Sequence, residues 1–322
     1  MNMADIVLIL GNGFDIDLGL KSKYSDFAKS DEWSNLYANK PKRFTIKEIK
    51  NHQSLLEQIR EAKYKTWFDL EEEIYNFVRE RKLDDNINQS VIDSNKQDFI
   101  SLKDSLKNYL IRQSEEYITD TTRLSFTILQ VLLSNKKCHK HIFSFNYTDC
   151  LKLCKLSGIS KDLLEYTHIH GSLNEDLVLG CEVYDGNNIN KNYSFLYKYN
   201  MLKRPNKIVK NLLEAKEVIF FGHSINEMDF CYFREYFKAI STTAGHNKNL
   251  TIICKDETSE INIKDNIRSQ GIIVTDLYNN LNVFGFIHTD MVYAHNDNEM
   301  KDLIVFLNRI KKYQAIQGIK TY

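Results

Sequence analysis

The stretch Ile6-Val7-Leu8-Ile9-Leu10, followed by Gly11-Asn12-Gly13-Phe14-Asp15, decides the fold of this chain. Five apolar residues that end at a Gly-x-Gly turn predict a buried strand leading into a nucleotide-binding turn. The glycines allow close approach of a phosphate, and the following helix N-terminus offers N–H groups. Ile16 stands where a dehydrogenase fingerprint has its third glycine, which disfavours a nicotinamide dehydrogenase. Asp15 is interpreted as a helix cap or as a partner of a ribose hydroxyl.

The composition is that of an ordinary globular protein. The 322 residues are 43% hydrophobic and 27% charged, and Lys plus Arg equals Asp plus Glu at 43 each. This balance argues against general binding of nucleic acid or of a membrane surface. We find no membrane-spanning run and no signal peptide, and the six cysteines form no C-x-x-C pair. We therefore expect a cytoplasmic protein with reduced cysteines, and no metal, since Cys138, His139 and His141 match no ligand spacing.

Strand-like and helical patterns alternate along most of the chain. Strands are predicted at residues 5–10, 141–145, 164–169, 177–179, 218–221, 250–254 and 271–275, and helices at 208–215, 230–240 and 303–310. This alternation predicts an α/β fold with a Rossmann-like, mainly parallel sheet and helices on both faces. Between residues 31 and 135 helical spacing dominates, as at Leu102, Leu106 and Tyr109. We expect this block to be a helical insertion between the first and second strands.

Four polar motifs directly follow predicted strands, which is where ligands bind in doubly wound sheets. They are Gly11–Asp15, Asn146–Asp149, His168–Ser172 and Gly222–Asn226. The amide of Asn146 both donates and accepts, so it suits a hydroxyl group or a water molecule. The alternative interpretation is a turn in which Asp149 caps the next helix.

The other two motifs also allow a functional and a structural interpretation. His170 lies at a strand end beside Gly171, a good position for a general base. It can equally be a hydrogen-bonded structural histidine, as can His168. Gly222 leaves room for a ligand, and the Ser224 hydroxyl can bind a ribose or phosphate oxygen, or cap a helix.

The combined motifs resemble the bacteriophage abortive-infection protein AbiH family, and their order resembles the sirtuin-like NAD-binding fold. The matching stretches are Gly11–Asp15, Gly19-Leu20, Asp26-Phe27, Trp67–Glu71, Phe145–Thr148, His168–Gly171 and Gly222–Asp229. The resemblance implies a sirtuin-like NAD-binding domain over residues 1–30 and 136–322, with residues 31–135 as the helical insertion. Thr148 stands where sirtuins carry an acidic residue, and the zinc-binding cysteine pairs are absent, which argues against protein deacetylation.

The resemblance also implies roles for particular residues. His170 and Asn146 would be catalytic, with Asn146 beside the nicotinamide ribose. The residues implied to bind NAD are Gly11, Asn12, Gly13, Phe14, Asp15, Asp149, Gly222, Ser224 and Asn226. In this arrangement the Gly11–Gly13 turn would hold the pyrophosphate.

The function expected from these roles is hydrolysis of NAD, as substrate, in antiphage defence by abortive infection. No metal takes part in the expected reaction. In such a defence system, the partners that the chain could have are a phage-derived activator and a second copy of itself. Two alternatives stay open: a non-catalytic sensor of NAD or ADP-ribose, and a metal-dependent nuclease of a defence system.

Overall fold

The computed structural model describes residues 4–38, 54–62, 69–81, 88–156, 162–182, 190–202, 206–243 and 246–313. The chain divides into two compact units. The sheet unit consists of residues 1–20, 118–169 and 205–322, and the helical unit consists of residues 21–117 and 170–204.

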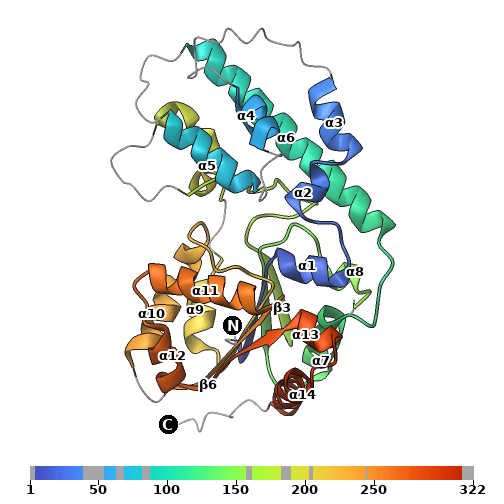
Figure 1. The fold of residues 1–322 in the computed structure, drawn as a ribbon, viewed down its shortest axis with the longest axis vertical. Helices are drawn as coiled ribbons and strands as arrows, with labels where there is room; N and C mark the ends of the chain where they lie inside the picture. The colour runs from blue at the N-terminus through green and yellow to red at the C-terminus, as the bar shows by residue number, and fades with distance from the viewer. Residues whose placement is uncertain are drawn as a thin grey trace. The chain divides into compact units, whose positions relative to one another are not determined.

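The sheet unit is built on a parallel sheet of six strands (Figure 1). The strands are β1 (Ile6–Leu10), β2 (Lys140–Ser144), β3 (Leu164–His168), β4 (Glu217–Phe221), β5 (His246–Cys254) and β6 (Leu281–His288). Their order across the sheet is β3-β2-β1-β4-β5-β6, and each neighbouring pair is parallel. This is the doubly wound order of Rossmann-like proteins, in which the chain reverses its direction of winding between β1 and β4.

The carboxyl ends of β1 to β4 lie level in the sheet. Leu10 pairs with both Ser144 and Phe221, and Ser144 pairs with His168. The residues that follow these strands therefore share one edge, here called the carboxyl edge. Ligands of doubly wound sheets bind at this edge, beside the reversal point between β1 and β4.

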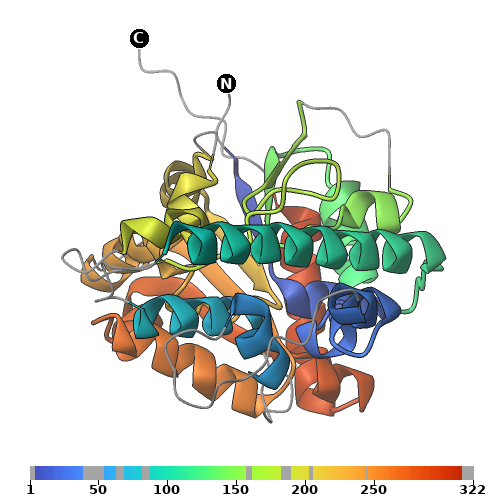
Figure 2. The ribbon, with the colours of Figure 1, turned by 90° about the horizontal axis from the view of Figure 1, so that it is seen from above.

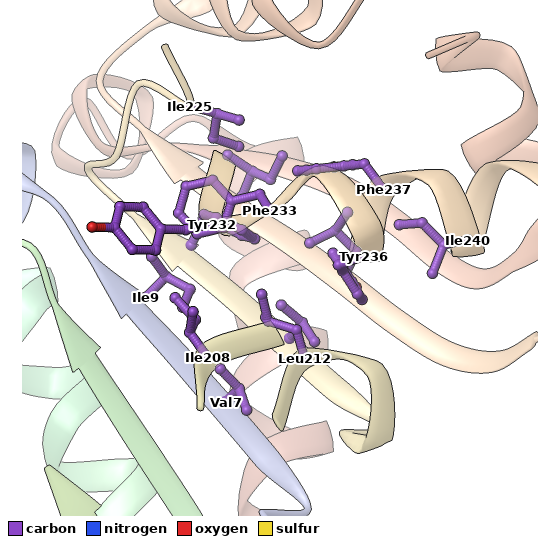
Figure 3. Close-up of a cluster of buried hydrophobic side chains, with 14 of the residues drawn as sticks. Val7, Ile9, Ile208, Leu212, Ile225, Tyr232, Phe233, Tyr236, Phe237 and Ile240 are labelled. Carbon is purple, nitrogen blue, oxygen red and sulfur yellow. The ribbon is translucent and has the colours of Figure 1, made fainter. Parts of the chain in front are cut away.

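Helices cover both faces of the sheet, as the alternating pattern predicts. One face packs against α9 (Ile208–Glu214), α10 (Arg234–Thr242), α11 (Glu257–Ser269) and α12 (Val274–Asn280). Figure 3 shows buried side chains of β1, α9 and α10 meeting in this layer: Val7, Ile9, Ile208, Leu212, Tyr236, Phe237 and Ile240. Because side chains alternate along a strand, Leu8 and Leu10 point to the opposite face.

The opposite face packs against α1 (Asn12–Leu18) and α14 (Asp297–Lys312). Phe14 of α1 meets Phe221 edge to face, with ring centroids 5.1 Å apart. Arg309 of α14 donates hydrogen bonds to Glu217 of β4 and Thr251 of β5. α7 (Leu124–Ser134) packs beside both helices, and α13 (Thr289–Tyr293) precedes α14. The α/β, Rossmann-like fold is thus confirmed.

The helical unit contains seven described helical elements. They are α2 (Tyr24–Phe27), α3 (Asp31–Ala38), α4 (Leu55–Ala62), α5 (Leu70–Glu80), α6 (Gln89–Glu116) and the 3-10 helices η2 (Lys191–Leu196) and η3 (Lys198–Asn200). α6 is 28 residues long, and Figure 2 shows it as one continuous helix. It buries Leu102, Leu106 and Tyr109, whose spacing predicts such a helix. Trp67, in the family-like motif, lies outside the described residues.

Two of the predicted strands are wrong, and one strand was not predicted. Residues 177–179 lie outside the strands of the sheet, and Gly271, with φ +80, begins a turn from α11 into α12. A short apolar run such as Ile272-Ile273-Val274 does not distinguish a strand from a helix start. The sixth strand is β6, whose apolar pattern is interrupted by Gly285.

The compact units group some residues differently from the predicted domains. α7 lies within the block 31–135 but packs in the sheet unit, whereas residues 170–204 pack in the helical unit. The domain boundaries at residues 30 and 135 stay a prediction.

Candidate functional site

The Gly-x-Gly turn after β1 packs directly against the turn after β4. The Gly13 amide donates to the Gly222 carbonyl at 2.9 Å, and the Gly11 amide donates to the Phe221 carbonyl at 3.0 Å. A Cβ on Gly13 would lie 2.6 Å from the Gly222 Cα, and a Cβ on Gly11 would lie 2.5 Å from the His223 Cα. These glycines are therefore required for contact between the two turns. The Gly13 amide, which belongs to the turn predicted to hold the pyrophosphate, already donates to a protein carbonyl.

A buried carboxyl group lies next to this contact. Asp15 is 2% exposed, and its side chain accepts hydrogen bonds from Asn146 Nδ2, at 2.9 Å, and from the Thr148 hydroxyl. Asn146 Nδ2 also donates to the Gly11 carbonyl at 3.0 Å. The N-cap of α1 is Gly11, and no side chain caps this helix, so the interpretation of Asp15 as a helix cap is wrong.

The main chain of Asn146 forms hydrogen bonds, as its side chain does. Its amide donates to Ser144 Oγ at 3.2 Å, and its carbonyl oxygen lies 2.9 Å from Nδ1 of His168. A carbonyl only accepts, so this contact places the proton of His168 on Nδ1. We call Asp15, Asn146, Thr148 and His168 the carboxyl-edge cluster. It joins the loop after β2 to α1 and to the end of β3.

Burial changes the acidity of Asp15. Desolvation raises its pKa from 3.8 to about 6, and the hydrogen bonds from Thr148 and Asn146 oppose this shift only in part. A carboxyl group with a pKa of about 6 exchanges protons near neutral pH, as general acids and bases do.

Asp15→Asn is expected to stabilise the fold at neutral pH. Between pH 3.8 and about 6 the folded protein retains a proton on Asp15 that the unfolded chain has lost. The stability contributed by the neutral carboxyl is complete below pH 3.8 and is lost as the pH rises through about 6. The loss amounts to about 3 kcal/mol, which Asp15→Asn avoids. Urea denaturation across this range checks the expectation, with Asp302→Asn, on the exposed side of α14, as the control; equal pH dependence in wild type and Asp15→Asn contradicts it.

The remaining predicted binding residues lie at the same edge of the sheet unit. Asp149 is the N-cap of α8 (Cys150–Leu153) and accepts from the amides of Leu151 and Lys152, which confirms the structural interpretation of this residue. Asn12 and Phe14 belong to the first turn of α1. Asn226 Oδ1 accepts from the Asp229 amide at 3.2 Å.

The interpretation of Ser224 as a helix cap is wrong. Ser224 is exposed, and the described structure has no helix beginning there; the next helical element is η4 (Phe230–Tyr232), with Asp229 as its N-cap. Ile225, with φ +50, takes a left-handed conformation that turns the chain away from a helical path.

The second predicted catalytic residue, His170, belongs to the helical unit, whereas Asn146 belongs to the sheet unit. His170 is buried, and its Nε2 lies 3.5 Å from Nζ of Lys198. Lys198 is fully buried and pairs with Glu71, with 2.9 Å between Nζ and Oε2.

The pairing of Lys198 with Glu71 beside His170 is not predicted from the sequence. The only signal for Lys198 is a single charge inside the aromatic run from Tyr193 to Tyr199. Within the part of the chain that the structure describes, no group of three or more His, Cys, Asp or Glu side chains is placed to hold a metal.

A doubly wound parallel sheet with polar side chains gathered at its carboxyl edge defines a Rossmann-like α/β protein. The chain belongs to the bacteriophage abortive infection AbiH family, whose family model matches residues 7–249. This membership indicates a role in phage abortive-infection defence. The matched residues include the carboxyl-edge cluster, Glu71, His170 and Lys198.

Comparison with curated proteins and with solved structures found no match. No helix among the described residues has the length and apolarity needed to cross a membrane.

Proposed function

We propose that this protein hydrolyses the N-glycosidic bond of NAD to nicotinamide and ADP-ribose in abortive infection. The observation that carries the proposal is the carboxyl-edge cluster, in which an oriented amide meets a carboxyl group with a pKa of about 6. Nucleotides bind at this edge in Rossmann-like sheets. Depletion of NAD in an infected cell would stop phage multiplication, in keeping with the family.

The reaction needs positioning and one base. A water oxygen forms a bond to C1′ of the nicotinamide ribose while the bond from C1′ to the nicotinamide nitrogen breaks. The electron pair stays with nicotinamide, which leaves as a neutral molecule without a general acid. The transition state is oxocarbenium-like, as in other glycosyl transfers. Asn146 Nδ2 donates to Gly11 and Asp15, so the amide oxygen of Asn146 would accept from a ribose hydroxyl or the water.

The proton of the attacking water goes to a base, for which the chain offers two candidates. His170 is the base that the sequence predicts. The structure adds Asp15, whose pKa of about 6 leaves it mostly ionised at neutral pH. Binding of the pyrophosphate by Gly11–Gly13 and the sirtuin-like likeness stay predictions.

The test is incubation of the purified full chain with NAD, with and without extract of phage-infected cells, followed by chromatography. Asn146→Ala is expected to slow nicotinamide release at least about a hundredfold, because the reacting groups lose their orientation. Asn298→Ala, which removes an exposed amide on α14, is the control and is expected to keep the wild-type rate. Loss of the base, in either Asp15→Asn or His170→Ala, should slow nicotinamide release by about 10²–10⁴-fold.

Asp15→Asn separates chemistry from folding, because it is expected to be more stable than the wild type and yet slower. Absence of nicotinamide under every condition contradicts NAD hydrolysis. Undiminished turnover in Asn146→Ala, Asp15→Asn and His170→Ala contradicts these residue roles.

A nucleotide sensor is the second candidate, favoured by the engaged amides of Gly13 and Asn146. Calorimetric binding of NAD or ADP-ribose without product over long incubation supports this candidate. Metal-dependent cutting of DNA or RNA, with NAD left intact, supports the nuclease alternative instead.

A further inference from the structure

The helical unit contains a lysine that is buried from water and lies beside a glutamate and a histidine. Lys198 has no exposed surface, and its ammonium group lies 2.9 Å from Glu71 Oε2 and 3.5 Å from His170 Nε2. Glu71 follows Asp69, the N-cap of α5, and Lys198 begins η3. α5 and η3 are distant in the sequence, and together they place the Glu71–Lys198 ion pair beside His170.

The ammonium group of Lys198 determines which tautomer His170 adopts. An ammonium group has three N–H donors and no acceptor, so the ring nitrogen facing it must carry the lone pair. His170 Nε2 is then the acceptor, and the ring proton belongs on Nδ1. Adding a second proton at Nε2 would place two positive donors against each other in a buried site, which is unfavourable.

The ion pair with Glu71 keeps Lys198 protonated, and protonated Lys198 opposes the addition of a second proton to His170. A buried lysine without an anion would lose its proton, whereas Glu71 at 2.9 Å favours the charged form. The same ion pair also acts on the Cys181 thiol of the helical unit: burial raises the pKa of this thiol most, Glu182 and Glu71 raise it further, and Lys198 lowers it. The structure thus places the Lys198 ammonium group beside His170 Nε2, and the Glu71 carboxylate beside that ammonium group.

We propose that Lys198 is a positioning residue that holds His170 as a neutral imidazole protonated on Nδ1, and that Glu71 holds Lys198 charged. His170 then serves as a hydrogen-bond donor and not as the proton acceptor of hydrolysis. This second statement rests on the proposed function, and it assigns the base to Asp15.

The first test is nitrogen-15 NMR of the full chain with labelled histidine, in which His170→Gln identifies the His170 signals. We expect a neutral ring with the proton on Nδ1 and no titration of His170 between about pH 5.5 and about pH 8.5. In Glu71→Gln/Lys198→Met, which removes both charges of the ion pair together, His170 should titrate near its ordinary pKa of about 6.5. An ordinary titration in the wild type, or unchanged spectra in the double variant, overturns the proposal.

The second test uses the pH profile of NAD cleavage. With His170 as a donor, His170→Gln keeps an N–H and should react at least about tenfold faster than His170→Ala. The acid limb of the profile should persist in His170→Gln and disappear in Asp15→Asn. Loss of the acid limb in His170→Gln makes His170 the base and overturns the inference. If the wild type cleaves no NAD, the proposed function fails, and the NMR titration alone decides the state of His170.

Discussion

Gly222→Ala is expected to lower the free energy of unfolding by about 3 kcal/mol or more, because two costs combine. Gly222 has φ +66, which L side chains rarely adopt. A Cβ there would also lie 2.2 Å from the Phe14 nitrogen and 2.4 Å from the Gly13 carbonyl carbon. Both are backbone atoms that cannot rotate away. The turns after β1 and β4 would have to separate, and the bond from the Gly13 amide to Gly222 would break.

Urea denaturation followed by circular dichroism measures this loss, and amide hydrogen exchange at Gly13 locates it. The matched control is Gly285→Ala in β6, where an added Cβ meets no atom within 4 Å. We expect this control to change the stability by no more than about 1 kcal/mol, in either direction. Equal effects of the two substitutions contradict the close contact of the turns.

Arg309→Ala is expected to cost about 3–5 kcal/mol, because it leaves a buried carboxylate without its cation. Glu217 has no exposed surface, and Arg309 binds it through two nitrogens, Nε at 3.0 Å and Nη2 at 2.8 Å. Arg309 Nη2 also donates to Thr251 Oγ1 at 2.8 Å. The substitution therefore removes the contact that joins α14 to β4 and β5. Thermal and urea denaturation measure the effect.

The double variant Glu217→Leu/Arg309→Met tests the cause. Replacing a buried ion pair by apolar side chains of similar volume is often neutral or stabilising, so the double variant should recover most of the loss. Arg268→Ala provides the control: Arg268 pairs with Asp265 at 3.0 Å, but its side chain is 75% exposed, and we expect a change of about 0–1 kcal/mol. A double variant as unstable as Arg309→Ala contradicts the explanation.

The sequence predicts the fold class and the edge of the sheet that carries the polar residues. The reason is local: apolar runs mark β1, β2 and β4, and glycine or asparagine follows each run directly or one residue later. In a parallel sheet such positions share one edge, so the sequence pattern by itself places Gly11, Asn146 and Gly222 together.

The features of the structure that the sequence does not predict depend on contacts between distant residues. Glu71 and Lys198 meet because η3 and α5 pack in one unit, and neither residue belongs to a spacing that predicts an ion pair. The partner of the Gly13 amide is likewise a backbone carbonyl of another turn, which no sequence pattern identifies. For the same reason the sequence indicates the residues of the carboxyl-edge cluster but not the pKa of Asp15, which depends on burial.

The central position of β1 has a consequence for synthesis of the chain on the ribosome. β1 leaves the ribosome before the other strands of the sheet, and its two partners begin only at Lys140 and Glu217. An entirely apolar strand must therefore wait, unpaired, while most of the helical segment is translated. Such delayed, long-range pairing slows folding and exposes a strand to aggregation. During translation, Ile6–Leu10 is thus the segment of the sheet that most needs protection by a chaperone.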